Sequence, residues 1–244
     1  MREPMSKMRR NYLVRLVLRS LIFVAFVLLF VFKPEFFSVL EGGRFFTEIS
    51  PLHLLWVLWM FDMLCQLVPV WKKLPVGSGK LFRGRFRPFK ETVNYPALRN
   101  HIIAATRAAY KVFLLWVGLL AILAALYYTH VIGKEILFLI SACFSVCDLI
   151  CVLIWCPFRL LLKNRCCTTC RIFNWDHLMM FTPLFFVPGF YTWSLFFFSL
   201  LVWLVWEFCV MLYPERFWEH SNAALQCANC TDKLCTQYCQ KLRQ

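Results

Sequence analysis

Cysteine is the residue type in this chain whose spacing points most directly to chemistry. The chain has 13 cysteines, and seven of them gather in two short stretches. The first stretch holds Cys166, Cys167 and Cys170, and the second holds Cys227, Cys230, Cys235 and Cys239. The Cys-x2-Cys spacing from Cys167 to Cys170 and from Cys227 to Cys230 is typical of zinc sites, and iron–sulfur clusters also commonly use four cysteines. The cysteines therefore predict a metal centre, with zinc or an iron–sulfur cluster, in a structural or redox role.

The same residues allow a plainer interpretation. Seven thiols are too many for one site with four ligands and few for two such sites. The alternative is a set of unconnected thiols, some of them lipidated beside a bilayer.

Three acids inside apolar segments form the second candidate site. Asp62, Asp148 and Glu207 each stand in an otherwise apolar run. An acid facing lipid near the bilayer centre costs ~2.5–3.5 kcal/mol on insertion scales, so these side chains are expected to face the protein interior, near Gln66. They predict a polar cluster that binds a cation or relays protons. The alternative is a structural network with Gln66 or with basic residues at the ends of the spans.

A basic stretch between residues 71 and 95 alternates cations with aromatic residues. Its candidate contacts with anionic lipid head groups are Arg83, Arg85, Arg87 and Lys90. Each base close to an anionic bilayer surface contributes ~1 kcal/mol. Because the stretch is tethered between two apolar segments, lipid is the expected partner and nucleic acid is unlikely.

A short polar run stands just before the fifth apolar segment. It reads Asn174-Trp175-Asp176-His177. We expect Asn174 or Asp176 to cap a helix there, and His177 to lie at the interface. Because no nucleophile motif accompanies the Asp–His pair, the sequence leaves open whether the protein is an enzyme.

Long apolar segments must position all these residues. The chain is 61% hydrophobic and 16% charged, whereas soluble domains are ~45–50% apolar and ~25% charged. The apolar residues collect in runs near the ~20 residues that cross a bilayer. The expected spans cover residues 14–33, 52–70, 109–130, 135–156, 177–190 and 193–213. The fifth is short and contains Pro183, Pro188 and Gly189, so a tilted hairpin partner or a re-entrant segment remains possible for it.

The distribution of basic residues predicts the topology. With the N-terminus inside, 24 of the 27 Lys and Arg residues fall in cytoplasmic segments, and the remaining three are Lys33, Arg44 and Lys134. Basic residues are retained on the cytoplasmic side. This distribution explains the net charge of +14, so the charge does not by itself indicate a nucleic-acid partner. The same distribution predicts that both termini lie in the cytoplasm. Arg15 and Arg19 are expected to extend toward head groups from the inner end of the first span.

The sequence thus predicts an all-α polytopic membrane bundle with about six transmembrane helices, in the cell membrane. Residues 1–213 form the helical domain, which includes the basic cytosolic loop 71–95, and residues 214–244 form a cysteine-rich cytosolic tail. The expected function is that of a membrane protein with a cytosolic metal centre. The alternatives are a small cation- or proton-coupled transporter and a non-catalytic assembly or scaffold protein.

Overall fold

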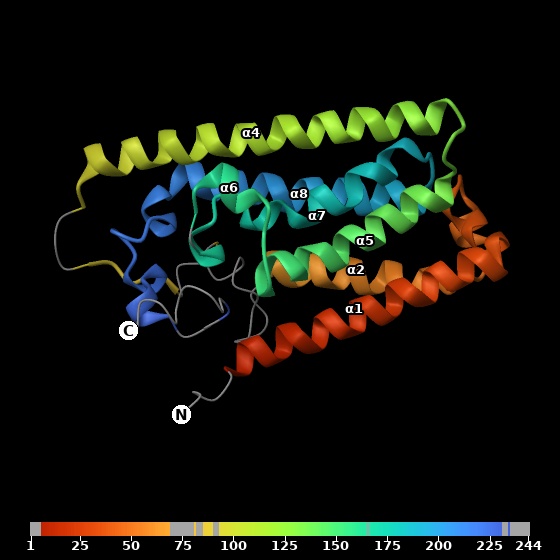
Figure 1. Cartoon of the computed structure of the whole chain (residues 1–244), viewed down its shortest axis with the longest axis horizontal. Helices are drawn as coiled ribbons and strands as arrows, with labels where there is room; N and C mark the ends of the chain where they lie inside the picture. Colours follow the sequence, from red (N-terminus) through yellow and green to blue (C-terminus); the bar gives the residue numbers. More distant parts are fainter. Residues whose placement is uncertain are drawn as a thin grey trace.

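Five long helices dominate the structure, a computed structural model that describes residues 6–68, 81, 85–89, 93–164, 166–230 and 234. They lie side by side along one direction (Figure 1). In the described residues, regular secondary structure is helical apart from two isolated β-bridges. The predicted all-α bundle is therefore confirmed for this part of the chain. The long helices are α1 (Lys7–Phe32), α2 (Leu52–Leu67), α4 (Tyr95–Tyr128), α5 (Lys134–Leu153) and α8 (Phe190–Leu212).

Four of these helices are long and apolar enough to cross a membrane: α1, α4, α5 and α8. Helix α2 has 16 residues and extends about 24 Å, less than the ~30 Å hydrocarbon core of a bilayer. Side chains on the outer faces are apolar and exposed, as for Val31 at 64% and Leu114 at 67%. Such faces suit a lipid environment, because lipid tails are as apolar as these side chains.

Local sequence signals set the helix ends. The side chain of Ser6 accepts a hydrogen bond from the Arg9 N–H and caps α1, which ends before Pro34. Asn94 caps α4 in the same way, and Pro96 occupies its first turn, where proline is favoured. Helix α4 then continues without a break to Tyr128. These caps satisfy backbone N–H groups that have no partner within the helix.

The predicted fifth span is a broken segment instead of one helix. It consists of α7 (Asp176–Phe181) and the 3-10 helix η6 (Thr182–Phe186), and it becomes extended at Val187. Pro183 lies in the first turn of η6, where its missing N–H prevents regular continuation of α7. The segment lies between α5 and α8, and residues such as Phe181 and Leu184 are fully buried in the core.

Two hairpin connections meet at the end of the bundle opposite the start of α1. The Gly42 N–H donates to the Pro188 carbonyl at 2.9 Å, and the Phe190 N–H donates to the Gly42 carbonyl at 3.0 Å. A Cβ atom on Gly189 would lie 2.1 Å from the Leu40 carbonyl oxygen. Only glycine allows this close approach of two backbones.

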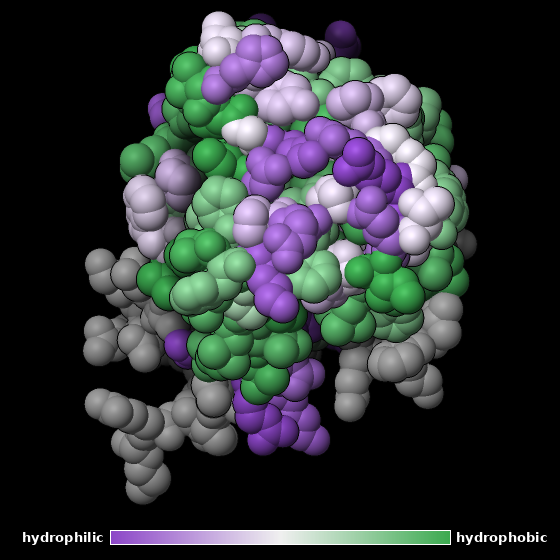
Figure 2. All heavy atoms as spheres, turned by 90° about the vertical axis from the view of Figure 1, so that its right-hand side faces the viewer, coloured by the Kyte–Doolittle hydropathy of each residue, from purple (hydrophilic) through white to green (hydrophobic). Residues whose placement is uncertain are grey.

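Hydrophilic residues gather at this end, which faces the viewer in Figure 2. They include Lys134 and Glu41, which form an ion pair of 2.8 Å. The short helices η1 (Pro34–Leu40) and η2 (Arg44–Phe46) belong to the same end. The opposite end carries α6 (Phe158–Leu162), η4 (Cys167–Thr169), η5 (Phe173–Trp175), η7 (Pro214–Phe217), η8 (Ala223–Leu225) and η9 (Cys227–Asn229).

Candidate functional site: a charge cluster around Arg19

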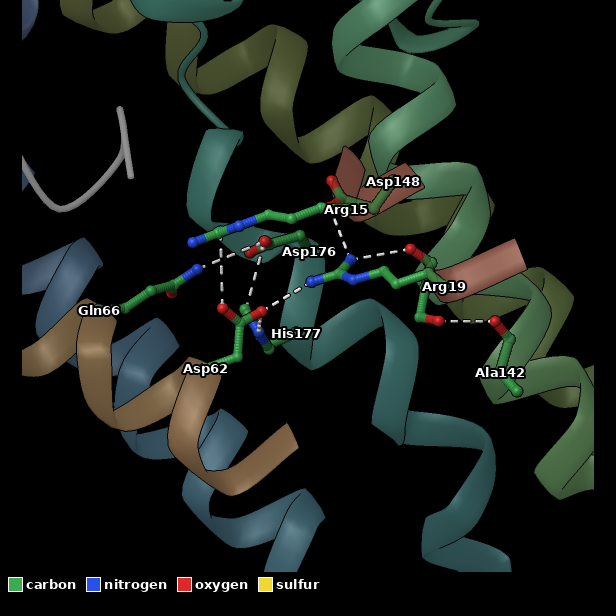
Figure 3. Close-up of polar contacts among 9 residues, drawn as sticks. Arg15, Arg19, Asp62, Gln66, Ala142, Asp148, Asp176 and His177 are labelled. Atoms are coloured by element: carbon green, nitrogen blue, oxygen red, sulfur yellow. Dashed lines mark hydrogen bonds and ion pairs between the residues drawn. The ribbon is translucent and has the colours of Figure 1, made fainter. Parts of the chain in front are cut away.

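Arg19 joins two of the three predicted intramembrane acids. Its Nη2 atom lies 2.7 Å from Asp62 Oδ2, and its Nη1 atom lies 3.4 Å from Asp148 Oδ2 (Figure 3). Nη1 also donates to the Ser145 carbonyl at 2.8 Å. The guanidinium group therefore connects α1 with α2 and α5. Asp62 and Asp148 share Arg19, which was expected from the sequence to extend toward head groups; a basic residue of a span as their partner corresponds to the structural alternative for these acids.

Small residues on α5 allow α1 to approach. Ser141, Ala142 and Ser145 are buried on α5, with exposed fractions of 0%, 2% and 4%. The Ser145 hydroxyl donates to the Ala142 carbonyl, so its polar group is satisfied within the helix. Small side chains permit close helix packing in membranes, and here they bring the Ser145 carbonyl within reach of Arg19.

His177 lies between two carboxylates. Its Nε2 atom lies 3.5 Å from Asp62 Oδ2, and its Nδ1 atom lies 3.3 Å from Asp176 Oδ2. The side chain is 2% exposed. An imidazolium presents an N–H donor at both nitrogens, whereas a neutral ring presents one donor and one acceptor. Both ring nitrogens of His177 lie within 3.5 Å of carboxylate oxygens, but neither contact has hydrogen-bond geometry, so a protonated ring would interact with these carboxylates as an ion pair.

The other members of the cluster are Arg15 and Gln66. Arg15 Nη1 lies 3.9 Å from Asp62 Oδ1, and Gln66 Nε2 lies 3.5 Å from Asp176 Oδ2. The two arginines and the three aspartates leave a formal charge of −1. One added proton makes the group neutral. Neutrality is strongly favoured where charges are withdrawn from water.

Several buried polar atoms beside the cluster have no hydrogen-bond partner among the described residues. They include Gln66 Oε1, Asp176 Oδ1 and both side-chain polar atoms of Asn174. Asn174 is 1% exposed. Neither Asn174 nor Asp176 caps α7, so the expected capping role is wrong. Unsatisfied buried groups are costly, and each one in a native structure needs a physical explanation, such as a bound water or ion.

Glu207 belongs to a separate ion pair. Arg171 donates from Nη1 to Glu207 Oε1 at 2.8 Å and from Nη2 to Oε2 at 2.5 Å. The Trp175 indole N–H also donates to Oε1, at 2.7 Å. This arrangement is bidentate, although Arg171 Nε has no hydrogen-bond partner among the described residues. The partner is a basic residue, as in the structural alternative for this acid, but it lies between η4 and η5 and not at the end of a span.

The two cysteine stretches approach one cavity. Cys166, Cys170 and Cys227 are among its lining residues. The described residues nevertheless include no group of three or more His, Cys, Asp or Glu side chains that could hold a metal ion. Cys235 and Cys239 lie outside the described residues. The zinc or iron–sulfur centre therefore stays a prediction, without support from the part of the chain that the structure describes.

Thiols at this end of the bundle differ in acidity. Burial raises the pKa of Cys167 to about 12, and the neighbouring Cys170, Cys166 and Cys156 act in the same direction. A hydrogen bond from the Cys151 thiol, with backbone N–H groups of Phe158 and Arg159, lowers the pKa of Cys156 below its ordinary value. Cys156 is thus the more nucleophilic of the two thiols at neutral pH.

The predicted lipid-binding stretch is described only in part. Arg83 and Lys90 lie outside the described residues. The Arg87 N–H donates to Asn222 Oδ1 at 3.2 Å, and the Arg87 carbonyl accepts from the Ala223 N–H at 2.9 Å. The backbone near Arg85 and Arg87 therefore packs on the segment that follows α8, while the Arg87 side chain is exposed. Contact with lipid head groups stays a prediction.

Comparison with known proteins gives no family. No protein family model matches this sequence, and neither a curated protein nor a solved structure is detectably similar to it. The fold and the site define a helical protein with four apolar helices of membrane-spanning length and a charged cluster between its helices.

Proposed function

We propose that this chain is a proton-coupled membrane transporter in which the Arg19 cluster binds and releases one proton. The proposal includes six crossings, with α2 and the broken α7–η6 segment as the two irregular ones, and both termini in the cytoplasm. The single observation that carries it is the position of His177, whose two ring nitrogens face Asp62 and Asp176. Broken helices at charged sites are a recurrent feature of transporters.

A proton suits this cluster better than a metal cation. Arg19 already occupies oxygens of Asp62 and Asp148, and Arg15 lies near the second oxygen of Asp62. Two guanidinium groups repel an incoming cation. A proton can instead bind directly to His177 or to a carboxylate, and it supplies the one positive charge that the cluster lacks. Chains of Asp, Glu and His inside membranes are typical of proton relays.

A route for the proton toward the cytoplasm is short. Asp148 lies five residues before the end of α5 at Leu153, which is about 8 Å along the helix. The Asp62 and Asp148 side chains are 24% and 22% exposed, whereas His177 is 2% exposed. Arg15, Asp62 and Asp148 are thus the more accessible members of the cluster, and His177 is the enclosed one. Release of the proton leaves a net negative charge in the interior, which favours rearrangement of the helices around it.

The primary test is proton binding by purified protein in detergent. Acid–base titration between pH 5 and 9 compares wild type with His177→Gln and with His220→Gln. His220 is 67% exposed and serves as the matched control, because it removes one ordinary histidine. We expect the two variants to give different titration curves. Identical curves would contradict the proposal.

Translocation is measured in proteoliposomes with an internal pH dye and an imposed membrane potential. We expect proton uptake above that of empty vesicles for wild type and for His220→Gln. His177→Gln and Asp148→Asn should reduce uptake to the level of empty vesicles. Wild-type uptake equal to that of empty vesicles would leave the cluster as a structural network.

A further inference from the structure

A cavity of about 730 Å³ lies at the end of the bundle where α1 begins and α8 ends. The first half of α4 forms one wall, α6 and the loop after it form another, and the end of α8 with the segment that follows closes the rest (Figure 1). This cavity takes no part in the Arg19 cluster, because none of the residues of that cluster lines it.

The charged lining of the cavity is mostly basic. Arg107, Lys111, Lys163 and Arg171 line it, against one acid, Glu219. Arg171 is neutralised by Glu207. Among the described residues, no ion pair involves Arg107, Lys111 or Lys163. Three uncompensated cations around one cavity favour an anion.

The backbone holds these cations in place. Arg107 and Lys111 are four residues apart on α4, so both project from one face of the helix. Lys163 ends α6 with a φ of +49°, a left-handed conformation that glycine or asparagine usually adopts at helix ends. A lysine in this conformation is uncommon. Strained positions of this kind are frequent where a side chain contacts a ligand.

Much of the remaining lining is apolar, although His101, Asn164 and Thr169 also line the cavity. The apolar residues include Ile102, Leu161, Leu162, Val210, Phe217 and Leu225. The cavity therefore combines a cationic region with an apolar region. Nearby faces of α4 and α8 are also apolar and exposed, with Leu115 at 60% and Met211 at 64%. An occupant with an anionic head and apolar chains satisfies both parts, whereas a small soluble anion satisfies only the first.

We propose that this cavity binds the phosphate head group of an anionic phospholipid from the inner leaflet. Basic pockets between helices on the cytoplasmic side are suited to this chemistry. The inference rests on the membrane topology of the proposed function and is independent of proton binding at His177. Lys111 stands where the strongly apolar part of α4 begins, with Leu114 and Leu115 following. In the proposed topology, Lys111 therefore lies at the boundary between the hydrocarbon core and the head groups, where lipid phosphates lie.

Native mass spectrometry of detergent-solubilised protein with added phosphatidylglycerol tests the proposal. The variant Arg107→Gln/Lys111→Gln is compared with Lys7→Gln/Arg10→Gln, which removes the same charge from exposed residues of α1. At ~1 kcal/mol for each base, the first variant should bind the lipid about 30-fold more weakly. The control should stay within about threefold of wild type. Equal weakening in both variants, or none in the first, would overturn the site.

Two further arms identify the occupant. Phosphatidylcholine should bind more weakly than phosphatidylglycerol, because its head group carries no net charge. Soluble glycerol phosphate at millimolar concentration should not displace phosphatidylglycerol; full displacement would overturn the assignment to a lipid. His177→Gln should bind phosphatidylglycerol as wild type does, so a failure of the proton proposal and a failure of this site give different results. Monodisperse elution of each variant confirms that folding is intact.

Discussion

Arg19 of α1 and Asp62 of α2 form an ion pair of 2.7 Å in which both side chains are mostly buried. The same guanidinium group reaches Asp148 on α5. One side chain thus connects α1, α2 and α5, and its single positive charge lies beside two carboxylates.

Arg19→Gln should destabilise the protein strongly. Removing one partner of a buried ion pair leaves the others uncompensated, at a cost of about 3–5 kcal/mol. Partial exposure of these side chains moves the expected loss toward about 3 kcal/mol. Reversible unfolding in mixed micelles gives the free energy of unfolding. Arg10→Gln, at an exposed position of α1, should change it by about 0.5 kcal/mol or less. Equal effects of the two substitutions would refute the central role of Arg19.

The Glu207–Arg171 pair should be energetically coupled but unrelated to proton binding. A double-mutant cycle of Glu207→Gln and Arg171→Gln should give a coupling free energy of about 1–3 kcal/mol, because the contact is bidentate and mostly buried. The acid–base titration of Glu207→Gln should still differ from that of His177→Gln. A coupling energy near zero would mean that the pair contributes little to folding.

Gly189→Ala should disturb the contact between the two hairpins. Its new Cβ would lie 2.1 Å from the Leu40 carbonyl oxygen, so backbone must move, at about 1–3 kcal/mol. Gly118→Ala in α4 is the matched control, since a Cβ there meets nothing within 4 Å and alanine favours helix by about 1 kcal/mol. The free energy of unfolding should therefore change in opposite directions. A stable Gly189→Ala protein would argue against the close approach of Leu40 and Gly189.

The rates at which Cys156 and Cys167 are alkylated should depend differently on pH. The thiolate is the reactive form. Because the pKa of Cys156 is lowered, this thiol carries more thiolate than Cys167 near neutral pH, and iodoacetamide should label it faster. With a pKa of about 12, Cys167 stays protonated near neutral pH and should label slowly. Peptide mass spectrometry measures both rates, and Cys156→Ser identifies the fast peptide. Faster labelling of Cys167 would contradict the assignment.

Reporter fusions should place the ends of the chain. A reporter fused after Gln244, or inserted within residues 72–95, should report the cytoplasm, because 24 of the 27 basic residues fall on that side of the proposed topology. A fusion truncated after Gly133, between α4 and α5, should report the outside. An external signal from the Gln244 fusion would support a re-entrant α7–η6 segment instead.

The regular part of this fold could be predicted from sequence because length and hydropathy are local properties. The start of α4 follows directly from Asn94 and Pro96. The expectation that Asp62 and Asp148 face one interior also followed from a local argument, the cost of an acid in lipid. Their shared partner could not be identified in that way, since it depends on which helices pack together.

The sequence predicts that Arg15 and Arg19 extend toward head groups, whereas their spacing of four residues on an apolar helix places both on one face. That spacing indicates that both arginines can reach the same acidic partner on a neighbouring helix. His177 and Asp176 were read as interfacial and capping residues. Their burial follows from the break at Pro183 and from the packing of α7 between α5 and α8, which neither composition nor periodicity encodes. The partner of Glu207 could not be predicted either, because Arg171 lies in a loop whose position depends on the tertiary fold.

The shared role of Arg19 has a consequence for biosynthesis. Asp62 follows Arg19 by 43 residues and Asp148 by 129, and His177 is made later still. At ~5–20 residues per second, the ribosome needs roughly 10–30 s after making Arg19 to reach His177. Throughout that interval the first helix carries two guanidinium groups whose counter-charges are incomplete. In the proposed membrane topology, α1 would enter the bilayer before its counter-charges on α2, α5 and α7 are made, which favours a partly hydrated environment for α1, such as the insertion machinery, until those helices follow.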